Sequence, residues 1–301
     1  MPQSKRDKVK NRRILTAIEW LVTIAAYGYL GYRLLTYGHY DRLSDLFGMS
    51  GIKEWLCFAL CLLLMPVNFF LESAKWKELL LYMHPLSRKE ALHQVLYGQM
   101  AAFVTPYRIG DIPARTSKLK DTHHWKSAIA LGMYGGIIQT FVIIACGIIP
   151  VFFFFRHTTP EYLLTVTSCL VIALILMAVM QKKSLPQSIR LTGRQFALTL
   201  VWSSLRYLCW LIQFVLIMSW AGVMLQPVDL FVALPAYYLF VTVTPNIPVA
   251  DAGIRGSWAV FTFGSFGVSA PVAALIALSM WAINTLLPVA LYLPLRSCIR
   301  Q

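Results

Sequence analysis

Long apolar runs with almost no charge are the feature of this sequence that most limits its possible folds. A helix needs about 20 apolar residues to span the hydrocarbon core of a bilayer, and runs such as 126–155 and 196–222 exceed that length. The chain is 58% hydrophobic and 13% charged, whereas a soluble domain carries about 25% charged residues. The apolar residues are continuous rather than alternating, so they predict helices and not the strands of a barrel. The sequence therefore predicts an all-α polytopic membrane protein.

Six full spans and two interrupted apolar stretches follow from these runs. The interrupted stretches, about 91–120 and 229–265, contain proline and glycine, which break helices. Because broken backbone is tolerated at membrane depth only where protein or water covers it, we expect both stretches to form re-entrant helical hairpins. The breakers are Pro106, Gly110 and Pro113 in the first stretch and Pro245, Pro248 and Gly253 in the second. The full spans are expected near 14–37, 52–74, 126–155, 160–181, 196–222 and 271–296.

Basic residues gather in alternate connections between these spans. Six lie in the N-terminal arm over 1–13, four in the segment 75–90, and four between Lys182 and Arg194. The positive-inside rule then places both termini in the cytoplasm. It also requires the first hairpin to begin and end on the cytoplasmic side and the second on the outer side. This placement explains the net charge of +14 without a nucleic-acid partner.

A short charged motif occurs twice in the chain. VTPYRIGDIPAR begins at Val104 and VTPNIPVADAGIR begins at Val243, and each places an aspartate four residues before an arginine. The order span, span, hairpin, span also occurs twice, in 14–155 and in 160–301. Because each half crosses the membrane three times, the second half is expected to be inverted relative to the first, as in many transporters.

The repeated motif supplies most of the candidate site residues. Aspartate and arginine four residues apart share one helical face and can pair, arginine is suited to phosphate, and charge within a membrane is costly enough to indicate function. Four arginines and three acids give the set a net charge of +1, which one phosphodiester would balance. The alternative is that the ion pairs only hold the hairpins together. The candidate headgroup-binding residues are Arg108, Arg115, Arg206 and Arg255, and the candidate charge partners are Glu72, Asp111 and Asp251.

Other polar residues within the spans are isolated. Arg206 is expected to face either the cavity or a carboxylate such as Glu72. Asn68, Gln139 and Asn284 each stand alone in a span. Such residues usually form hydrogen bonds between membrane helices, and we expect that role here.

The sequence carries no HExxH, P-loop or Gly-x-Ser-x-Gly motif. Its six cysteines have no CxxC spacing, so neither a metal site nor a disulfide framework is expected. His123 and His124 lie beside Lys118 and Trp125, which favours a membrane-interface loop over an acid–base site. We therefore expect no enzymatic activity and no cofactor.

Three stretches of the chain resemble the lysylphosphatidylglycerol synthase transmembrane region, also called the flippase-like family. GQMAAFVTPYRIGDIPARTSKL resembles its Pro-x-Arg-x-Gly-acid signature with a following arginine. ESAKWKELL, over 72–80, is similar to the segment before that signature, and TPNIPVADAGIRGSWAVFTFGSFGV is similar to the second signature. The resemblance implies an integral membrane protein that moves a lipid or lipid-linked headgroup between leaflets. The matching positions of the first signature are Pro106, Arg108, Gly110, Asp111 and Arg115.

Two positions depart from the family pattern. Gly256 stands where the second signature usually carries glutamate, and Trp281 stands where the last span often carries arginine. Either Asp251, about one turn before Gly256, replaces that acid, or the substrate differs, or transport is impaired. No aminoacyl transferase domain accompanies the region in this sequence, so lysine transfer is not expected.

The sequence thus predicts a lipid flippase-like transporter that moves an anionic phospholipid or a lipid-linked headgroup. It is expected in a bacterial-type inner (plasma) membrane, as a multi-pass protein with cytoplasmic N- and C-termini. Its expected partner is a membrane lipid or lipid-linked substrate. Two alternatives stay open: a membrane-embedded transferase acting on a lipid-linked sugar or an aminoacyl lipid, and a non-transporting subunit of a lipid-modifying complex.

Overall fold

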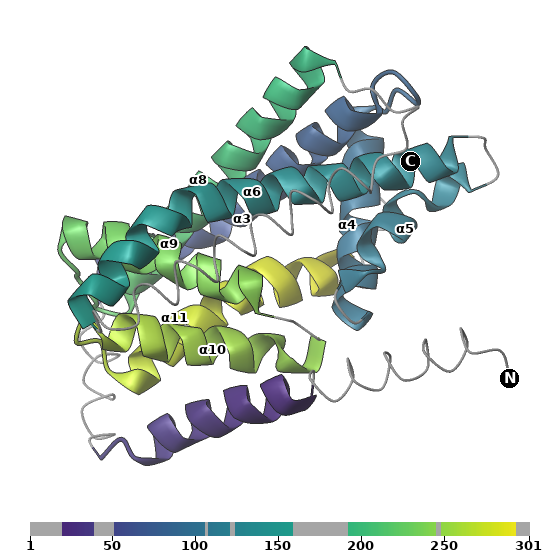
Figure 1. Ribbon diagram of the computed structural model, residues 1–301. Coiled ribbons are helices and arrows are strands. Elements are labelled where there is room, and N and C mark those ends of the chain that lie inside the picture. Colours follow the sequence, from purple (N-terminus) through teal and green to yellow (C-terminus); the bar gives the residue numbers. More distant parts are fainter. Residues whose placement is uncertain are drawn as a thin grey trace, which may run out of the picture.

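All regular structure that the computed structural model describes is helical, as the sequence predicts. The described residues are 20–38, 51–105, 108–120, 124–158, 192–244 and 248–292. Figure 1 shows their helices side by side in a bundle. They are a helix over 20–35, α3 (Ile52–Leu80), α4 (Arg88–Val104), α5 (Asp111–Arg115), the 3₁₀ turn η2 (Ser117–Leu119), α6 (Trp125–Thr158), α8 (Gly193–Trp220), α9 (Pro227–Val243), α10 (Pro248–Gly264), α11 (Ala270–Trp281) and the π-helical turn η4 (Ala282–Leu286).

Four of these helical segments are long and apolar enough to cross a bilayer, which indicates a membrane protein. They coincide with four of the six predicted spans. The span predicted near 160–181 lies outside the described residues, and the one near 14–37 is described only as the helix over 20–35. The count of six and the inverted repeat therefore stay predictions. The four segments are Ile52–Leu80, Trp125–Phe155, Gly193–Trp220 and Ala270–Tyr292.

The helix α3 is longer than the sequence predicts. We expected the span to end near residue 74 and assigned Lys75 and Lys77 to a connection, but the helix continues to Leu80. Trp76 and Leu80 are buried and extend the apolar face. Lys75 is buried as well, with its Nζ 2.7 Å from a carboxylate oxygen of Glu72. Because this charge is paired inside the protein, it does not end the helix.

Both interrupted stretches consist of a helix, a break and a second helix. The helices α4 and α9 end at a Val-Thr-Pro motif. The Thr105 hydroxyl donates to the Ala101 carbonyl and the Thr244 hydroxyl donates to the Phe240 carbonyl, each at 2.7 Å. Proline lacks an N–H and disfavours helical backbone in the residue before it. The repeated Val-Thr-Pro is therefore a helix stop, although Pro106 and Pro245 themselves lie outside the described residues.

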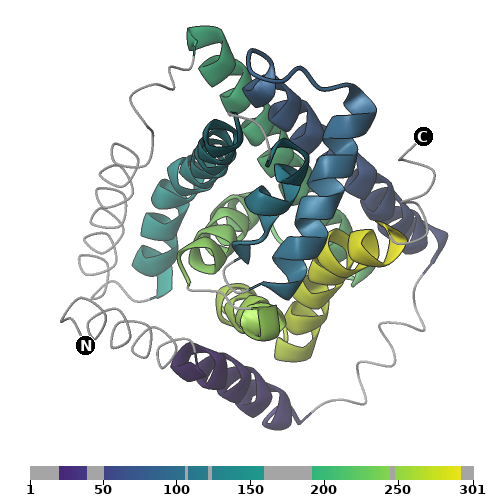
Figure 2. The same cartoon turned by 90° about the vertical axis from the view of Figure 1, so that its right-hand side faces the viewer.

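The helices beside the two breaks are short. α4, α9 and α10 have 17 residues each, which corresponds to about 25 Å, less than the roughly 30 Å of a hydrocarbon core. In Figure 1, α9 and α10 run in opposite directions, so the chain returns toward the end from which α9 started. Every residue from Ala233 to Val241 is buried. Figure 2 shows that α9 lies inside the bundle with other helices around it, which accounts for this burial.

A capping box fixes the start of α4. The Ser87 hydroxyl accepts from the Glu90 backbone N–H at 3.2 Å, and the Glu90 carboxylate accepts from the Ser87 backbone N–H at 2.9 Å. These bonds stabilise the carboxylate and hold the pKa of Glu90 below its usual value. The cap thus satisfies two backbone N–H groups at the start of α4.

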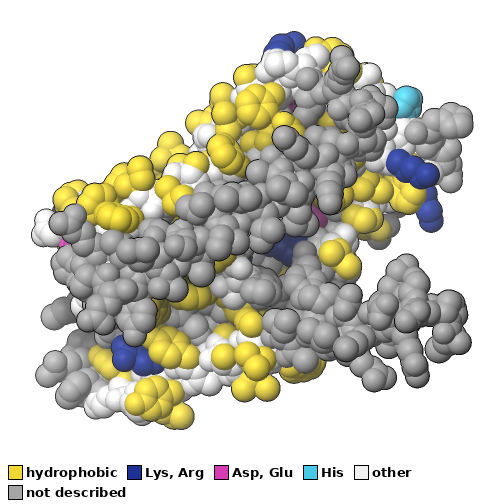
Figure 3. Space-filling view, viewed as in Figure 1, with side chains coloured by type: hydrophobic (Ala, Val, Ile, Leu, Met, Phe, Trp, Pro, Cys, Tyr) yellow, Lys and Arg dark blue, Asp and Glu magenta, His cyan; other side chains and the backbone are white. Residues whose placement is uncertain are grey.

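Exposed basic side chains mark one end of the molecule, here named the basic end. Figure 3 shows hydrophobic side chains over much of the described surface and Lys and Arg mainly toward the upper right, where α4, α6 and α8 begin in Figure 1. This distribution is typical of a membrane protein with one basic face. The residues of the basic end are Arg88, Lys89, Lys118, Lys120, Lys126 and Arg194.

Close packing of α9 on α6 depends on Gly147. A Cβ atom at this position would lie 3.0 Å from Leu239 Cβ and 3.1 Å from the Pro235 carbonyl oxygen. We expect Gly147→Leu to separate the two helices and to cost about 1–3 kcal/mol of stability, measured as a lower unfolding temperature in detergent. The control is Gly136→Leu in the same helix, where nothing lies within 4 Å of an added Cβ. Equal unfolding temperatures for the two variants would contradict this role.

Candidate functional site

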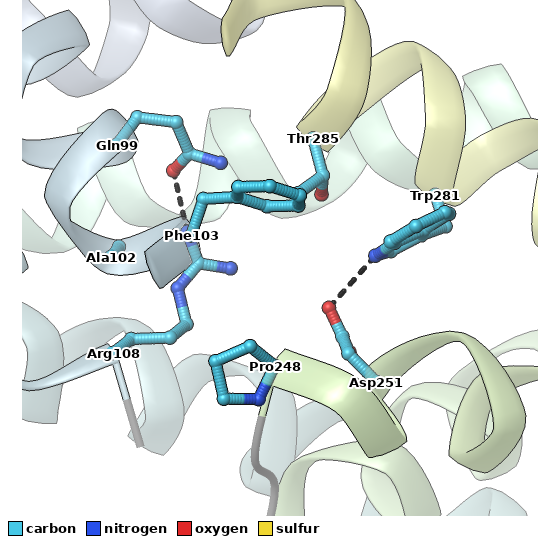
Figure 4. Close-up of a pocket in the computed structure, with 8 residues that line it drawn as sticks. All are labelled: Gln99, Ala102, Phe103, Arg108, Pro248, Asp251, Trp281 and Thr285. Carbon is cyan, nitrogen blue, oxygen red and sulfur yellow. Dashed lines mark hydrogen bonds between the residues drawn. The ribbon is translucent and has the colours of Figure 1, made fainter. Parts of the chain in front are cut away.

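A small cavity joins the two broken stretches. Its volume is ≈ 20 Å³, about the space that one or two water molecules occupy. In Figure 4, side chains of α4 and of the first break lie on one side, and those of α10, α11 and η4 lie on the other. The two Val-Thr-Pro motifs, which are about 140 residues apart, therefore end their helices at one place. The lining residues are Gln99, Ala102, Phe103, Arg108, Pro248, Asp251, Trp281 and Thr285.

Arg108 is the accessible cation of this cavity. Its side chain is exposed, and one guanidinium nitrogen donates to the Gln99 side-chain oxygen. Figure 4 shows the guanidinium beside Gln99 and Phe103. None of the ion pairs among the described residues includes Arg108. Arg108 is thus the one candidate arginine that forms no ion pair with a described carboxylate.

The backbone at Arg108 is unusual. Its φ is +56°, in the left-handed region that non-glycine residues rarely adopt. Thr105 holds this turn, because its carbonyl accepts from the Arg108 N–H at 3.2 Å and its hydroxyl accepts from the Gly110 N–H at 2.9 Å. Such a conformation costs about 1–3 kcal/mol and is found most often at functional sites. Here it aims the Arg108 side chain into the cavity.

Asp251 lines the same cavity across from Arg108, and both of its carboxylate oxygens accept hydrogen bonds. One carboxylate oxygen accepts from Arg255 Nε at 2.7 Å, and the other accepts from the Trp281 indole N–H at 2.9 Å. Figure 4 shows the hydrogen bond from Trp281 to this carboxylate, with Arg108 on the other side of the cavity. The predicted pair of Asp251 and Arg255 is confirmed. The tryptophan that departs from the family pattern is its hydrogen-bond donor.

Glu72 is the centre of a second, buried cluster. Its two oxygens accept from three cations on three helices: Lys75 at 2.7 Å, Arg115 at 2.7 Å and Arg206 at 2.6 Å. Glu72 is only 5% exposed. The expectation that Arg206 faces either the cavity or a carboxylate is therefore resolved in favour of the carboxylate.

Arg115 also pairs with Asp111 through two parallel hydrogen bonds, of 2.6 and 2.8 Å. This is the ion pair that the first motif predicts. Gly98 on α4 makes room for it, since a Cβ atom there would lie 2.3 Å from an Asp111 carboxylate oxygen and 2.6 Å from Arg115 Cγ. The guanidinium also lies 5.8 Å from the centre of the Trp76 ring, close enough for a cation–π interaction.

Amides extend the Glu72 cluster to neighbouring helices. Asn68 accepts from Arg206 Nε at 2.7 Å and donates to Asn284 at 3.1 Å. Gln139 accepts from Lys75 at 3.4 Å and donates to the Ser203 carbonyl at 3.2 Å. The interhelical role predicted for Asn68, Gln139 and Asn284 is confirmed.

The structure divides the predicted site residues into three groups. Arg115, Arg206, Glu72 and Asp111 form the buried cluster, Asp251 and Arg255 form a separate pair, and Arg108 stands apart. Lys75 was missed as a cluster member, because its position in a basic segment indicated a loop. Adding it to the predicted set gives five cations and three acids, a net charge of +2. Among the described residues, no group of three or more His, Cys, Asp or Glu side chains is placed to hold a metal ion.

The proline and glycine residues that were predicted to break the two hairpins have different structural roles. Gly110 lies in the turn before α5, Pro113 is inside α5, and Pro248 is the first residue of α10. Gly253 faces the helix over 20–35, where an added Cβ would lie 2.9 Å from the Tyr27 ring. The breakers therefore act both in turns and in a close helix contact.

Gly256, which stands where the resembled family usually carries glutamate, also packs against the helix over 20–35. A Cβ atom at Gly256 would lie 2.9 Å from Leu30 Cδ2, and the next residue, Ser257, donates its hydroxyl to the Ala26 carbonyl at 2.6 Å. Small residues allow such close approach of membrane helices. The Leu30 side chain thus lies where the first carbon of a glutamate side chain at position 256 would be, and it would have to shift.

No protein-family model matches this chain, and no curated protein matches it. The resemblance to the lysylphosphatidylglycerol synthase region therefore stays a prediction.

Removing the central negative charge should destabilise the protein strongly. Glu72→Gln keeps the shape of the side chain but leaves Lys75 and Arg206 without an ion-pair partner among the described residues. Loss of one member of a buried charged group costs about 3–5 kcal/mol. We expect a clear fall in the unfolding temperature in detergent, and little change for Glu54→Gln in the first turn of the same helix. If the two variants unfold at the same temperature, Glu72 does not organise the bundle.

Introducing glutamate at position 256, as in the family that the sequence resembles, should also be unfavourable. We expect Gly256→Glu to lower the unfolding temperature because the side chain meets Leu30. The companion change Leu30→Ala should recover part of the loss. Gly264→Glu in the same helix is the control, since the nearest atom to an added Cβ there is 3.8 Å away. A fully stable Gly256→Glu would refute the steric explanation.

Proposed function

We propose that this protein moves an anionic phospholipid or a lipid-linked headgroup between membrane leaflets, as a flippase-like transporter. The observation that supports this most directly is Arg108, an accessible cation without a carboxylate partner among the described residues. It lines a cavity at which both helix breaks meet. A forked, permanently charged guanidinium is well suited to bind a phosphate group.

The other three arginines have a supporting role in this proposal. Arg115, Arg206 and Arg255 each have a carboxylate partner, which neutralises part of their charge, and none of them lines the cavity. In this proposal Arg108 contacts the headgroup, and the three paired arginines stabilise the helices around it. The sequence left open whether the charged residues bind a headgroup or only hold the hairpins together by ion pairs. In this assignment both roles occur, in different residues.

The cavity is too small for a headgroup as it stands. At ≈ 20 Å³ it holds no more than one or two water molecules, so transport requires the α4–α5 segment and α10 to separate. The short helices supply the parts that move. By the positive-inside rule the basic end faces the cytoplasm, the first stretch is re-entrant from that side, and the second is re-entrant from outside. The acyl chains stay in lipid.

A transferase is less well supported by this geometry. Asp251, the carboxylate at the cavity, uses one oxygen for Arg255 and the other for Trp281, and such a carboxylate is a poor general base. His124 is exposed at the start of α6 and does not line the cavity.

Lipid movement in liposomes tests the proposal. Purified protein is reconstituted, and the transfer of tail-labelled anionic and zwitterionic phospholipids is followed by quenching with dithionite. We expect faster movement of the anionic lipid with the wild-type protein. Arg108→Ala should lower that rate at least about tenfold, since a lost charged contact of roughly 1.4 kcal/mol has this effect. Arg108→Lys should retain part of the activity.

The control variant is Arg194→Ala, which removes an exposed arginine at the basic end. It should move lipid at the wild-type rate. Unfolding temperatures establish that each variant is folded; Arg115→Ala is avoided because Arg115 is buried in ion pairs. An unchanged rate for Arg108→Ala would remove Arg108 from the path. No movement of either phospholipid or of a polyprenyl-linked phosphate would refute the transport function.

A further inference from the structure

A second pocket lies near the basic end, here named the aromatic pocket. Its volume is ≈ 130 Å³, several times that of the cavity at Arg108. It lies between α4, the segment from α5 to η2, and the last described helical turn. It shares no lining residue with the Arg108 cavity. Its lining residues are His93, Gln94, Tyr97, Ala114, Ser117, Lys118 and Tyr292.

Three rings form one side of the aromatic pocket. The centres of His93 and Tyr97 are 6.5 Å apart with the planes inclined by 20°, and Tyr292 lies 5.7 Å from His93 and 6.4 Å from Tyr97. The Tyr292 hydroxyl is 3.1 Å from His93 Nε2, which fixes these two rings. Tyr97 is 39% exposed and leaves an aromatic surface at the mouth.

Polar groups complete the lining of the aromatic pocket. Ser117 and Lys118 are exposed residues of η2 and contribute a hydroxyl group and a cation. A lining that combines aromatic rings with a hydroxyl and an ammonium group suits a ligand with two parts. Its phosphate would pair with Lys118 and Ser117, and the C–H face of its polyhydroxyl ring would lie against Tyr97 and His93.

A hydrogen bond and a cation–π contact connect the lining of the aromatic pocket to the buried Glu72 cluster. Gln94 accepts from the Trp76 indole N–H at 2.7 Å, and Trp76 lies under the Arg115 guanidinium. Ala114 and Ser117 flank Arg115 in sequence, within one turn. A ligand in this pocket would therefore contact residues that adjoin Arg115 in sequence.

We infer that the aromatic pocket binds the phosphorylated sugar or cyclitol headgroup of a lipid from the leaflet at the basic end. This inference rests on the proposed function for the identity of the ligand as a lipid. It adds the class of headgroup: a phosphate that carries a polyhydroxyl ring, rather than a bare phosphate or a choline. The headgroup is held here outside the Arg108 cavity, and the two sites are separate.

Equilibrium binding to the full chain in detergent tests the inference. The probes are tail-labelled phosphatidylinositol, phosphatidic acid and phosphatidylcholine. We expect phosphatidylinositol to bind about tenfold more tightly than phosphatidic acid, with phosphatidylcholine the weakest. Tyr97→Ala should abolish the preference for phosphatidylinositol, and Lys118→Ala should weaken both anionic lipids. The control is Lys120→Ala, an exposed lysine two residues further that does not line the pocket.

Competition with soluble inositol 1-phosphate and with inorganic phosphate distinguishes the sources of the ligand. Displacement of the lipid by inositol 1-phosphate alone supports recognition of the ring and phosphate together. Equal displacement by inorganic phosphate overturns it, as does a Tyr97→Ala variant with unchanged preference or a Lys118→Ala variant that matches Lys120→Ala. Pocket-dependent binding without lipid movement in liposomes would support the pocket and refute transport. Lipid movement without such binding would do the reverse.

Discussion

Burial of charge is the constraint on which this structure depends. An ionised carboxylate away from water is tolerated only when cations and hydrogen bonds surround it, and Glu72 meets this condition with three partners. Two of those partners come from α5 and α8, so the need to neutralise one side chain fixes three segments relative to one another. The first break and Arg108 directly precede α5, whose Arg115 makes one of these contacts.

The same constraint applies to the backbone. A helix that ends inside a membrane protein exposes carbonyl groups that need donors, and here Thr105 and Thr244 satisfy some of them with their own hydroxyls. The last residues of both helices, Val104 and Val243, are exposed, whereas Thr105 and Thr244 are partly buried. The residues just beyond the two breaks, Arg108 and Pro248, line one small cavity with polar groups in it.

Local spacing made part of this structure predictable. The two Asp-x-x-x-Arg pairs, the helix stops at Val-Thr-Pro and the partnership of Glu72 with Arg206 follow from residues that are rare in apolar runs. Lys75 could not be assigned, because a lysine near the end of a span reads as a loop residue unless its partner is known. The tight contact of Gly256 with Leu30 joins residues more than 200 positions apart, and the left-handed backbone of Arg108 depends on the fold around it. Neither leaves a signal in the sequence.

The partners of Glu72 are made at different times during synthesis. Lys75 is three residues away on the same helix, whereas Arg115 and Arg206 follow 43 and 134 residues later. At about 5–20 residues per second the last of them emerges roughly 7–27 s after Glu72. Arg115 emerges earlier, roughly 2–9 s after Glu72, and until then Lys75 is the one cation of the cluster that has been synthesised. A carboxylate that is buried in the finished protein therefore starts with a counter-ion on its own helix.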